Sequence, residues 1–219
     1  MEERNFASQE RKTDENMTEQ LTQPKPATPP RKASPTRLKI LQVAASLFAD
    51  RGFSGVGVNE IGEATGLGRG ALYYHISSKE DLLYDITTAY MSDLIADGKA
   101  ILDSEVDPII RTQKLSRALM MTISEHLSEM TVCFREIHAL TAERRRAVLS
   151  LHSDYQAIWS QSLSDGLAKG QFRPIPSTVL KGLLGMYFYS FLWLDPRGPQ
   201  NAADIGDAFA EVVLRAVRV

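Results

Sequence analysis

Hydrophobic residues recur at helical spacing from Thr36 to the end of the chain, and the period of two that marks a strand is absent. The first segment ends at Gly52 and has apolar residues at intervals of three and four: Leu38, Leu41, Ala45 and Phe48. Two short helices are expected next, over 58–65 and 69–75, joined by the tight turn Thr65-Gly66-Leu67-Gly68.

The helical period continues after residue 79. Ser77-Ser78 and Asp107-Pro108 are typical helix starts, because their oxygens accept bonds from free backbone N–H groups and proline fits the first turn. Helices are expected over 79–102, 108–128, 130–140, 142–169, 177–194 and 201–217. The pattern predicts an all-α fold with a small three-helix head over 36–80 and a larger helical body over 81–219.

Residues 1–35 differ in composition from the rest. They are polar and hold five of the ten prolines, so they bury too little apolar surface to offset the entropy of ordering. We expect a disordered arm. Its second half and the start of the first helix carry cations with no acid between them: Lys25, Arg31, Lys32, Arg37 and Lys39. This basic stretch is either a solubilising tail or an arm that lies on DNA phosphates.

Bulk composition excludes several classes of protein. The net charge is −2, so nucleic-acid binding requires a local basic patch rather than the whole surface. Cys133 is the single cysteine, which rules out an internal disulfide and fits a small buried residue in a reducing compartment. The longest apolar run, 182–194, is too short to span a membrane, and the first ten residues lack the apolar middle of a secretion signal. We expect a cytoplasmic protein without a membrane partner.

Signals for an enzyme are missing from the sequence. The four histidines lack metal-ligand spacing, and neither a phosphate-cradling glycine loop nor a nucleophile elbow occurs. The sequence therefore predicts no catalysis, no metal and no cofactor.

Residues 58–75 have the form of a helix-turn-helix, with two helices joined by a short glycine-containing turn. Leu67, Leu72 and Ile76 would hold the second helix against the head. The rest of that helix would face outward with residues suited to DNA: Arg69, Gly70, Ala71, Tyr73, Tyr74 and His75. Arginine pairs with guanine edges, whereas tyrosine, histidine and the following Lys79 suit phosphates.

The segment ILQVAASLFADRGFSGVGVNEIGEATGLGRGALYYHISSKEDLL resembles the N-terminal domain of the TetR family of bacterial transcription regulators. The shared features are LFADRGF, the V-x-E-I helix start and G-x-L-Y-x-H-x-x-S-K-E. The resemblance implies that residues 69–75 form a recognition helix in the major groove, with Arg69, Gly70 and Ala71 at bases. Tyr73, Tyr74, His75 and Lys79 would then contact the backbone, and Val58 and Asn59 the DNA flank. Gly68 departs from the family, which often has a hydroxyl residue there.

Family members bind inverted repeats as symmetric dimers and usually repress transcription, so the resemblance implies a homodimer on double-stranded DNA. Residues 179–194 fit this role because they are apolar nearly all round, and such a helix must be buried on every face. A partner subunit would cover the outer side, with Gly182 and Gly185 permitting close approach. The alternative is burial inside a monomer.

The resemblance also implies an effector pocket in the body. We expect it to be lined by flexible and aromatic residues that could equally form plain core: Met120, His126, Leu127, Met130, Phe134, Tyr155 and Trp159. The helix over 142–169 followed by GQFRP is similar to a TetR subgroup that senses acyl-CoA thioesters. An acyl-CoA or a hydrophobic carboxylic acid is therefore favoured, with Arg135 and the run Arg144-Arg145-Arg146 for phosphates. The alternatives are solvated arginines, a multidrug-type pocket, or a helical adaptor that binds no DNA.

Overall fold

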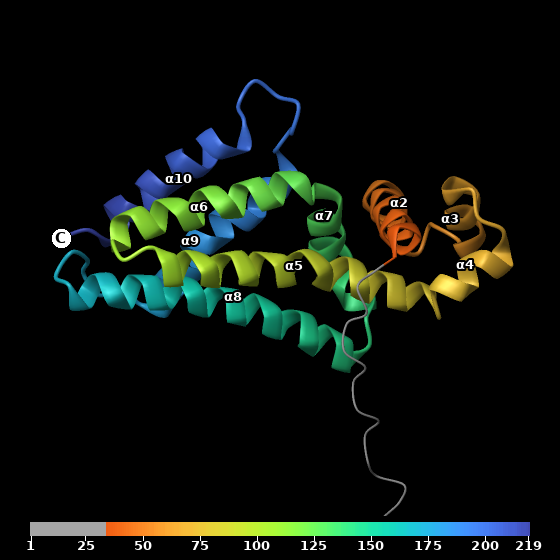
Figure 1. The fold of residues 1–219 in the computed structure, drawn as a ribbon, viewed down its shortest axis with the longest axis horizontal. Helices are drawn as coiled ribbons and strands as arrows, with labels where there is room; N and C mark the ends of the chain where they lie inside the picture. Colours follow the sequence, from red (N-terminus) through yellow and green to blue (C-terminus); the bar gives the residue numbers. More distant parts are fainter. Residues whose placement is uncertain (1–33) are drawn as a thin grey trace, which may run out of the picture. The chain divides into compact units, whose positions relative to one another are not determined.

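A long helix, α5 (Lys79–Ser104), connects two groups of helices within residues 34–219, the part of the chain that the structure describes (Figure 1). The structure is a computed structural model. α5 starts where the sequence predicts, because the Ser78 hydroxyl accepts a hydrogen bond from the Asp81 N–H at 3.0 Å. Asp85 on α5 is bonded to Arg37 in the first group, and Gly98 packs against Ile158 in the second.

The first group, which we call the head, consists of three helices packed against the start of α5. They are α2 (Pro35–Arg51), α3 (Val58–Thr65) and α4 (Arg69–His75), in the positions that the sequence predicts. The core between them holds fully buried apolar side chains from each helix: Ile40, Ala44 and Phe48 of α2, Ile61 of α3, and Leu72 of α4.

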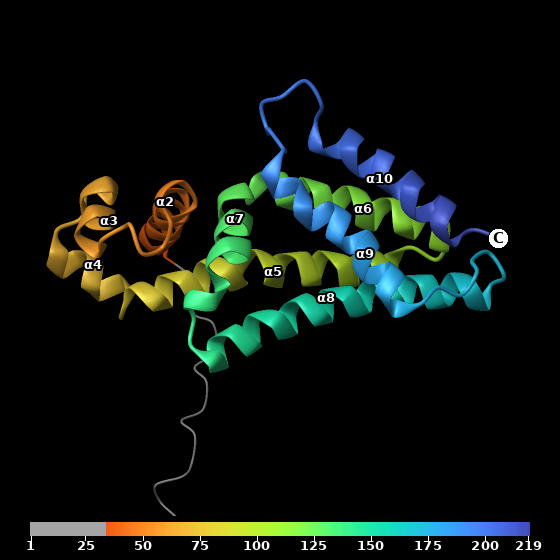
Figure 2. The same ribbon diagram turned by 180° about the vertical axis from the view of Figure 1, so that it is seen from behind.

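The second group, the body, surrounds the remainder of α5. It contains α6 (Pro108–Glu125), α7 (Leu127–Glu136), α8 (Ala142–Ala168), α9 (Ser177–Phe188) and α10 (Ala202–Val217). Short 3₁₀ turns follow α7 over Ile137–Ala139 and α9 over Tyr189–Leu192. α8 packs along α5 and α10 along α6, α9 contacts both α6 and α8, and α7 lies between α5 and α2 (Figure 2).

Several helix ends differ by a few residues from the sequence prediction, and two of the differences change how a segment is divided. The break expected near residue 129 lies at His126, which ends α6 and begins α7 with a non-helical ψ of 36°. The segment 177–194 was expected to be one helix, but its α-helical part ends at Phe188 and a 3₁₀ turn continues to Leu192. Periodicity cannot detect either change, because apolar spacing runs through both.

The predicted disordered arm lies outside the described residues, except for Ser34 and Pro35, and α2 begins at Pro35 rather than Thr36. Arg37 and Lys39, two cations of the predicted basic stretch, form hydrogen bonds within the head and to α5. Arg37 donates to the His75 carbonyl and to the Asp85 carboxylate, and the Lys39 ammonium donates to the Thr65 carbonyl at 3.1 Å. These contacts join α2 to α3, α4 and α5.

The described chain from 34 to 219 is all-α, as predicted, with an isolated bridge between Phe172 and Arg218 outside the helices. None of its helices combines the length and apolarity needed to cross a membrane. Residues 35–219 form a single compact unit, so the boundary expected between residues 80 and 81 falls inside the first turn of α5.

Gly166 on α8 provides a test of the packing in the body. A Cβ atom placed there would lie 2.0 Å from Cδ2 of the buried Phe172 ring. We expect Gly166→Ala to lower the free energy of unfolding by about 1–3 kcal/mol, because overpacking displaces the ring. Urea denaturation would measure this change. Ser164→Ala, an exposed neighbour on the same helix, should change stability by less than about 0.5 kcal/mol. Equal stabilities for Gly166→Ala and the control would contradict this packing.

Candidate nucleic-acid interface and ligand pocket

The turn between α3 and α4 has a defined backbone geometry. Gly66 adopts a left-handed φ of 75°, which suits glycine because it lacks a Cβ atom. Its N–H bonds to the Glu63 carbonyl at 3.1 Å, and the Leu67 N–H bonds to the Gly62 carbonyl at 2.9 Å. This pair of bonds forms a Schellman motif. The motif sets the direction in which α4 leaves α3.

α4 has one buried face and one exposed face. Leu72 and the following Ile76 are buried, and Leu67 in the turn packs against the same core. The side chain of Tyr74 is 86% exposed and that of Tyr73 is 45% exposed. The remaining predicted DNA contacts of α4 are also on this outer side: Arg69, Gly70 and Ala71 are exposed, and His75 is half-buried. The structure therefore brings all six α4 residues predicted from the sequence onto one accessible surface.

Side chains on this surface contact one another. The Arg69 guanidinium lies 5.8 Å from the centre of the Tyr73 ring, and the Tyr74 and His75 rings meet edge to face at 5.1 Å. Gly68, the residue before α4, provides no side-chain cap, consistent with the departure seen in the sequence. Arg69 can therefore stack on an aromatic face while keeping its donors free for a ligand.

Val58 and Asn59, predicted to reach the DNA flank, open α3. Val58 is half-buried, whereas Asn59 is exposed. Asn59 and Arg69 both line a groove of about 350 Å³ between α3 and α4. An amide and a guanidinium thus both line this groove next to α4.

Lys79, predicted as a phosphate clamp, has neighbours within the head. Its ammonium lies 4.2 Å from the centre of the Phe53 ring and 5.9 Å from that of Phe48. Burial lowers the pKa of Lys79, and the charge of Glu136 on α7 partly opposes this effect. The side chain remains half-exposed, so phosphate binding would compete with the aromatic contact.

The head and the start of α8 are joined by ion pairs that involve one of the predicted phosphate-binding arginines. Arg144 pairs with Asp81 and lies 3.7 Å from Glu80, whose carboxylate also accepts the Thr141 N–H at 2.9 Å. Arg144 is therefore held by α5 carboxylates. Arg135 donates to the Ala49 carbonyl at 3.3 Å, which connects α7 to α2. The neighbours of Arg144, residues 145 and 146, are exposed.

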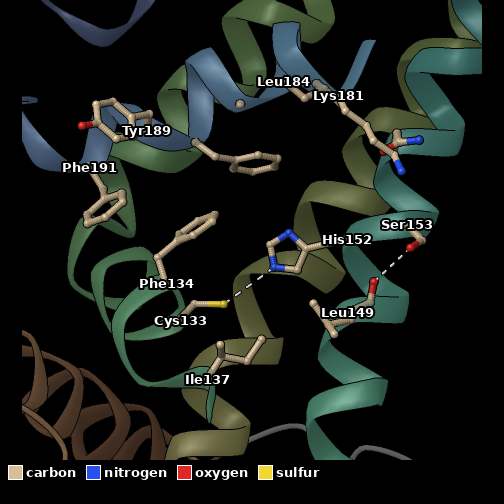
Figure 3. A pocket seen from close by; sticks show the side chains of 13 residues that line it. Cys133, Phe134, Ile137, Leu149, His152, Ser153, Lys181, Leu184, Tyr189 and Phe191 are labelled. Atoms are coloured by element: carbon tan, nitrogen blue, oxygen red, sulfur yellow. Dashed lines mark hydrogen bonds between the residues drawn. The ribbon is translucent and has the colours of Figure 1, made fainter. Parts of the chain in front are cut away.

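The body contains a pocket of about 590 Å³ between α7, α8 and α9 (Figure 3). Phe134 is the one member of the predicted pocket set that lines it. Four other members are buried in the core and do not reach the pocket: Met120, Met130, Tyr155 and Trp159. His126 and Leu127 lie half-buried at the junction of α6 and α7. The predicted set thus describes mainly the core that supports the pocket.

Sequence reasoning missed the pocket residues on α8 and α9. The α8 face that carries Tyr155 and Trp159 packs inward, whereas the face with His152, Ser153 and Gln156 turns to α9. The i,i+4 pair His152 and Gln156 marks this face in the sequence. The α9 side adds Lys181, Leu184, Gly185 and Phe188.

Aromatic rings form most of one side of the pocket. The Phe134 and Phe191 rings stack with centres 5.4 Å apart, and Phe188 lies 5.8 Å from Phe134. The imidazole of His152 meets Phe134 and Phe188 edge to face at 6.0 and 5.5 Å. Its Nε2 lies 3.7 Å from the Cys133 Sγ. Burial lowers the pKa of His152 and raises the pKa of Cys133, so both groups are neutral at pH 7.

The geometry described above defines a class: a helical protein with a helix-turn-helix head and a pocketed helical body. Residues 40–86 match the family model described as bacterial regulatory proteins of the tetR family, and residues 105–217 match the tetracyclin repressor-like C-terminal domain. The chain belongs to the TetR family.

Known relatives match over most of the chain. The HTH-type transcriptional repressor KstR2 of Mycobacterium tuberculosis is 28% identical over 184 residues, which cover 83% of this chain and 92% of KstR2. The structure of the TetR-family regulator PfmR from Thermus thermophilus matches with a TM-score of 0.76 at 28% identity, covering 80% of this chain and 97% of PfmR.

A further solved relative was crystallised with ligands. AibR in complex with isovaleryl coenzyme A and operator DNA matches with a TM-score of 0.70 at 26% identity. The match covers 81% of this chain and 97% of AibR. The body of this chain thus shares its fold with a protein whose crystals hold both an acyl-CoA and DNA.

The junction of α6 and α7 is expected to make stability depend on pH. Glu129, 3.6 Å from the His126 ring nitrogen, raises the pKa of His126. The His126–Glu129 pairing stabilises the fold fully below about pH 6.5, the pKa of a histidine in the unfolded chain. The stabilisation is lost as the pH rises through the higher pKa that His126 has in the folded chain. Glu129→Gln should remove it. The difference in unfolding free energy between wild type and variant, from urea denaturation at pH 6 to 8, should therefore shrink with rising pH. A difference that stays constant would contradict the His126–Glu129 pairing.

Proposed function

We propose that this protein is a ligand-responsive transcriptional repressor that binds an inverted-repeat DNA operator as a homodimer. The observation that carries the proposal is the exposed outer face of α4, supported from beneath by Leu72 and Ile76. A helix of this kind fits the major groove, where residues at its exposed face reach base edges.

Each α4 residue takes a role that follows from its chemistry. Arg69 reads a base, with guanine as the usual partner of an arginine fork. Gly70 and Ala71 are small and allow the helix to approach the groove closely. The Tyr73 hydroxyl, Tyr74 and His75 bind phosphate oxygens, which fix the register of the head on the duplex. Asn59 and Val58 at the start of α3 contact the flanking backbone.

A dimer is supported by exposed apolar residues on α9, on the 3₁₀ segment that follows it and on α10. Tyr189, Leu192 and Trp193 are 49–63% exposed, and Val179 and Val212 extend the same apolar character along the two helices. A Cβ atom at Gly182, which is not part of the pocket lining, would meet nothing within 4 Å, so a partner helix could approach the backbone there. Two heads spaced about 34–36 Å apart would read two half-sites.

The effector that we favour is an acyl-CoA or a related hydrophobic carboxylic acid. The pocket between α7, α8 and α9 has an apolar aromatic side and one lysine, a composition suited to an apolar chain that carries an anionic group. The complex of AibR with isovaleryl coenzyme A supports this class. Release from DNA requires the effector to bind unequally to the DNA-bound and free forms.

The DNA-binding proposal predicts separable effects on affinity and base preference. An operator is first selected from a pool of random DNA duplexes by binding to the protein. The affinity of each variant for this operator is then measured by fluorescence anisotropy. Arg69→Ala should weaken operator binding by about 10-fold or more and relax one base position, because a bidentate base contact is lost. Tyr73→Phe should weaken binding to every sequence by about 3- to 10-fold, because it loses a phosphate bond.

Arg145→Ala is a matched control, since it removes the same charge from an exposed position on α8. It should leave operator affinity unchanged. Wild-type affinity should also fall steeply with salt. If Arg69→Ala behaves like Arg145→Ala in both affinity and preference, the α4 surface does not read DNA.

The dimer proposal predicts that Gly182→Leu yields folded monomers. The side chain would project from α9 into space that is open in one subunit, so it should block the partner without disturbing the monomer core. Sedimentation velocity at micromolar concentration should show a monomer, and operator affinity should drop by at least about 100-fold. Ala96→Leu, on the exposed side of α5, is the control and should remain dimeric. A dimeric Gly182→Leu variant with full affinity would exclude this interface.

A further inference from the structure

Two of the polar residues that line the pocket between α7, α8 and α9 lie apart from each other, and the pocket also has Ser153 and Gln156 in its lining. One is His152, whose ring is surrounded by the Phe134 and Phe188 rings. The other is Lys181, which is exposed on the first half of α9. Figure 3 shows Lys181 on the opposite side of the pocket from Phe134 and Phe191. A ligand that fills the pocket would therefore meet His152 among the aromatic rings and the Lys181 cation on the exposed side.

The interior group has a defined orientation. The His152 Nε2 faces the Cys133 sulfur at 3.7 Å, and the other ring nitrogen, Nδ1, points away from Cys133 into the pocket (Figure 3). The Cys133 thiol stays protonated because burial raises its pKa, and the imidazole stays neutral because burial lowers its pKa. A thiol sulfur is a weak acceptor, whereas a neutral imidazole nitrogen is a good one. In the tautomer that carries the ring proton on Nδ1, Nε2 can accept a hydrogen bond from the Cys133 S–H.

We propose that His152 donates its Nδ1–H to the carbonyl oxygen of an acyl thioester, while Lys181 binds the anionic carrier of that acyl group. The inference rests on the proposed function and specifies which atoms of the effector are recognised. The apolar chain would pack against the Phe134, Phe188 and Phe191 rings. An N–H donor among aromatic rings favours ligands that have a carbonyl oxygen over ligands that lack one. A ligand without this acceptor would leave the N–H group unpaired in an apolar site.

Ser153 has no part in this recognition, although it lines the same pocket. Its hydroxyl donates to the Leu149 carbonyl at 3.1 Å within α8. This bond occupies the hydroxyl proton. Ser153 is therefore a suitable control for a substitution next to His152.

Isothermal titration of the full chain without DNA tests the carbonyl contact. Octanoyl-CoA and S-octyl-CoA share the chain and the nucleotide, but the thioether has no carbonyl oxygen. Wild type should bind octanoyl-CoA about 5- to 10-fold more tightly than S-octyl-CoA. His152→Leu should bring this ratio close to one, and Ser153→Ala should keep it. A wild-type ratio of one, or a ratio unchanged in His152→Leu, would overturn the carbonyl contact.

The anionic contact is tested with a third probe, octanoyl-N-acetylcysteamine, which keeps the thioester and lacks the charged nucleotide. Lys181→Gln should weaken octanoyl-CoA binding by about 3- to 5-fold at low salt and leave binding of the uncharged thioester unchanged. Lys99→Gln, on the exposed side of α5, is the charge-matched control and should change neither. Equal losses for both thioesters in Lys181→Gln would overturn the anionic contact.

The role of His152 and the choice of an acyl-CoA as effector give different results in these titrations. Binding of CoA compounds without carbonyl discrimination overturns the role of His152 and leaves an acyl-CoA-responsive repressor in place. Failure of every CoA compound to bind overturns both the inference and the favoured effector class. DNA binding is measured separately by the operator titration, and its result does not depend on whether any CoA compound binds.

Discussion

The presentation of α4 depends on the packing of its buried face against α5 and the neighbouring head helices. Leu72 and Ile76 are buried in the same core as Leu82 and Ile86 of α5. Because these side chains face the core, Arg69 and the two tyrosines of α4 face solvent. α5 is unbroken for 26 residues, or about 39 Å at 1.5 Å per residue. The same helix therefore contributes to the core of the head and to that of the body. α5 thus runs as one continuous helix from the core of the body to the residues beneath α4.

α7 provides a second route between pocket and head. Cys133, Phe134 and Ile137 line the pocket, while Arg135 bonds to the α2 carbonyl of Ala49 and Glu136 lies near Lys79. Neighbouring residues of one short helix thus face two different sites. If a ligand in the pocket displaced Phe134 together with α7, the contact of Arg135 with α2 would change as well.

The fold and the exposed residues of α4 could be predicted from the sequence, but the residues that line the pocket could not. Helix periodicity, the Ser78 and Asp107 caps and Gly66 define elements through local interactions, which a sequence contains directly. The pocket depends on which face of α8 turns to α9, and this follows from packing between residues far apart in the chain. Trp159 and His152 are both plausible lining residues by type, yet only His152 faces the pocket. The partner of Arg144, Asp81, lies 63 residues away in the chain and could not be found from the sequence, and the role of Arg144 toward effector phosphates stays a prediction.

The burial of Cys133 has a practical consequence for spectroscopy. Its thiol is 2% exposed, and burial raises its pKa, so maleimide and methanethiosulfonate reagents would find little accessible thiolate in the native chain. A cysteine introduced on the outer face of α4 would then be the principal site of labelling, with the native thiol left in place. Spin labels attached there in a symmetric pair of subunits would give a single separation to measure by pulsed resonance. In the proposed dimer, that separation followed during effector titration would report the distance between the two α4 helices directly.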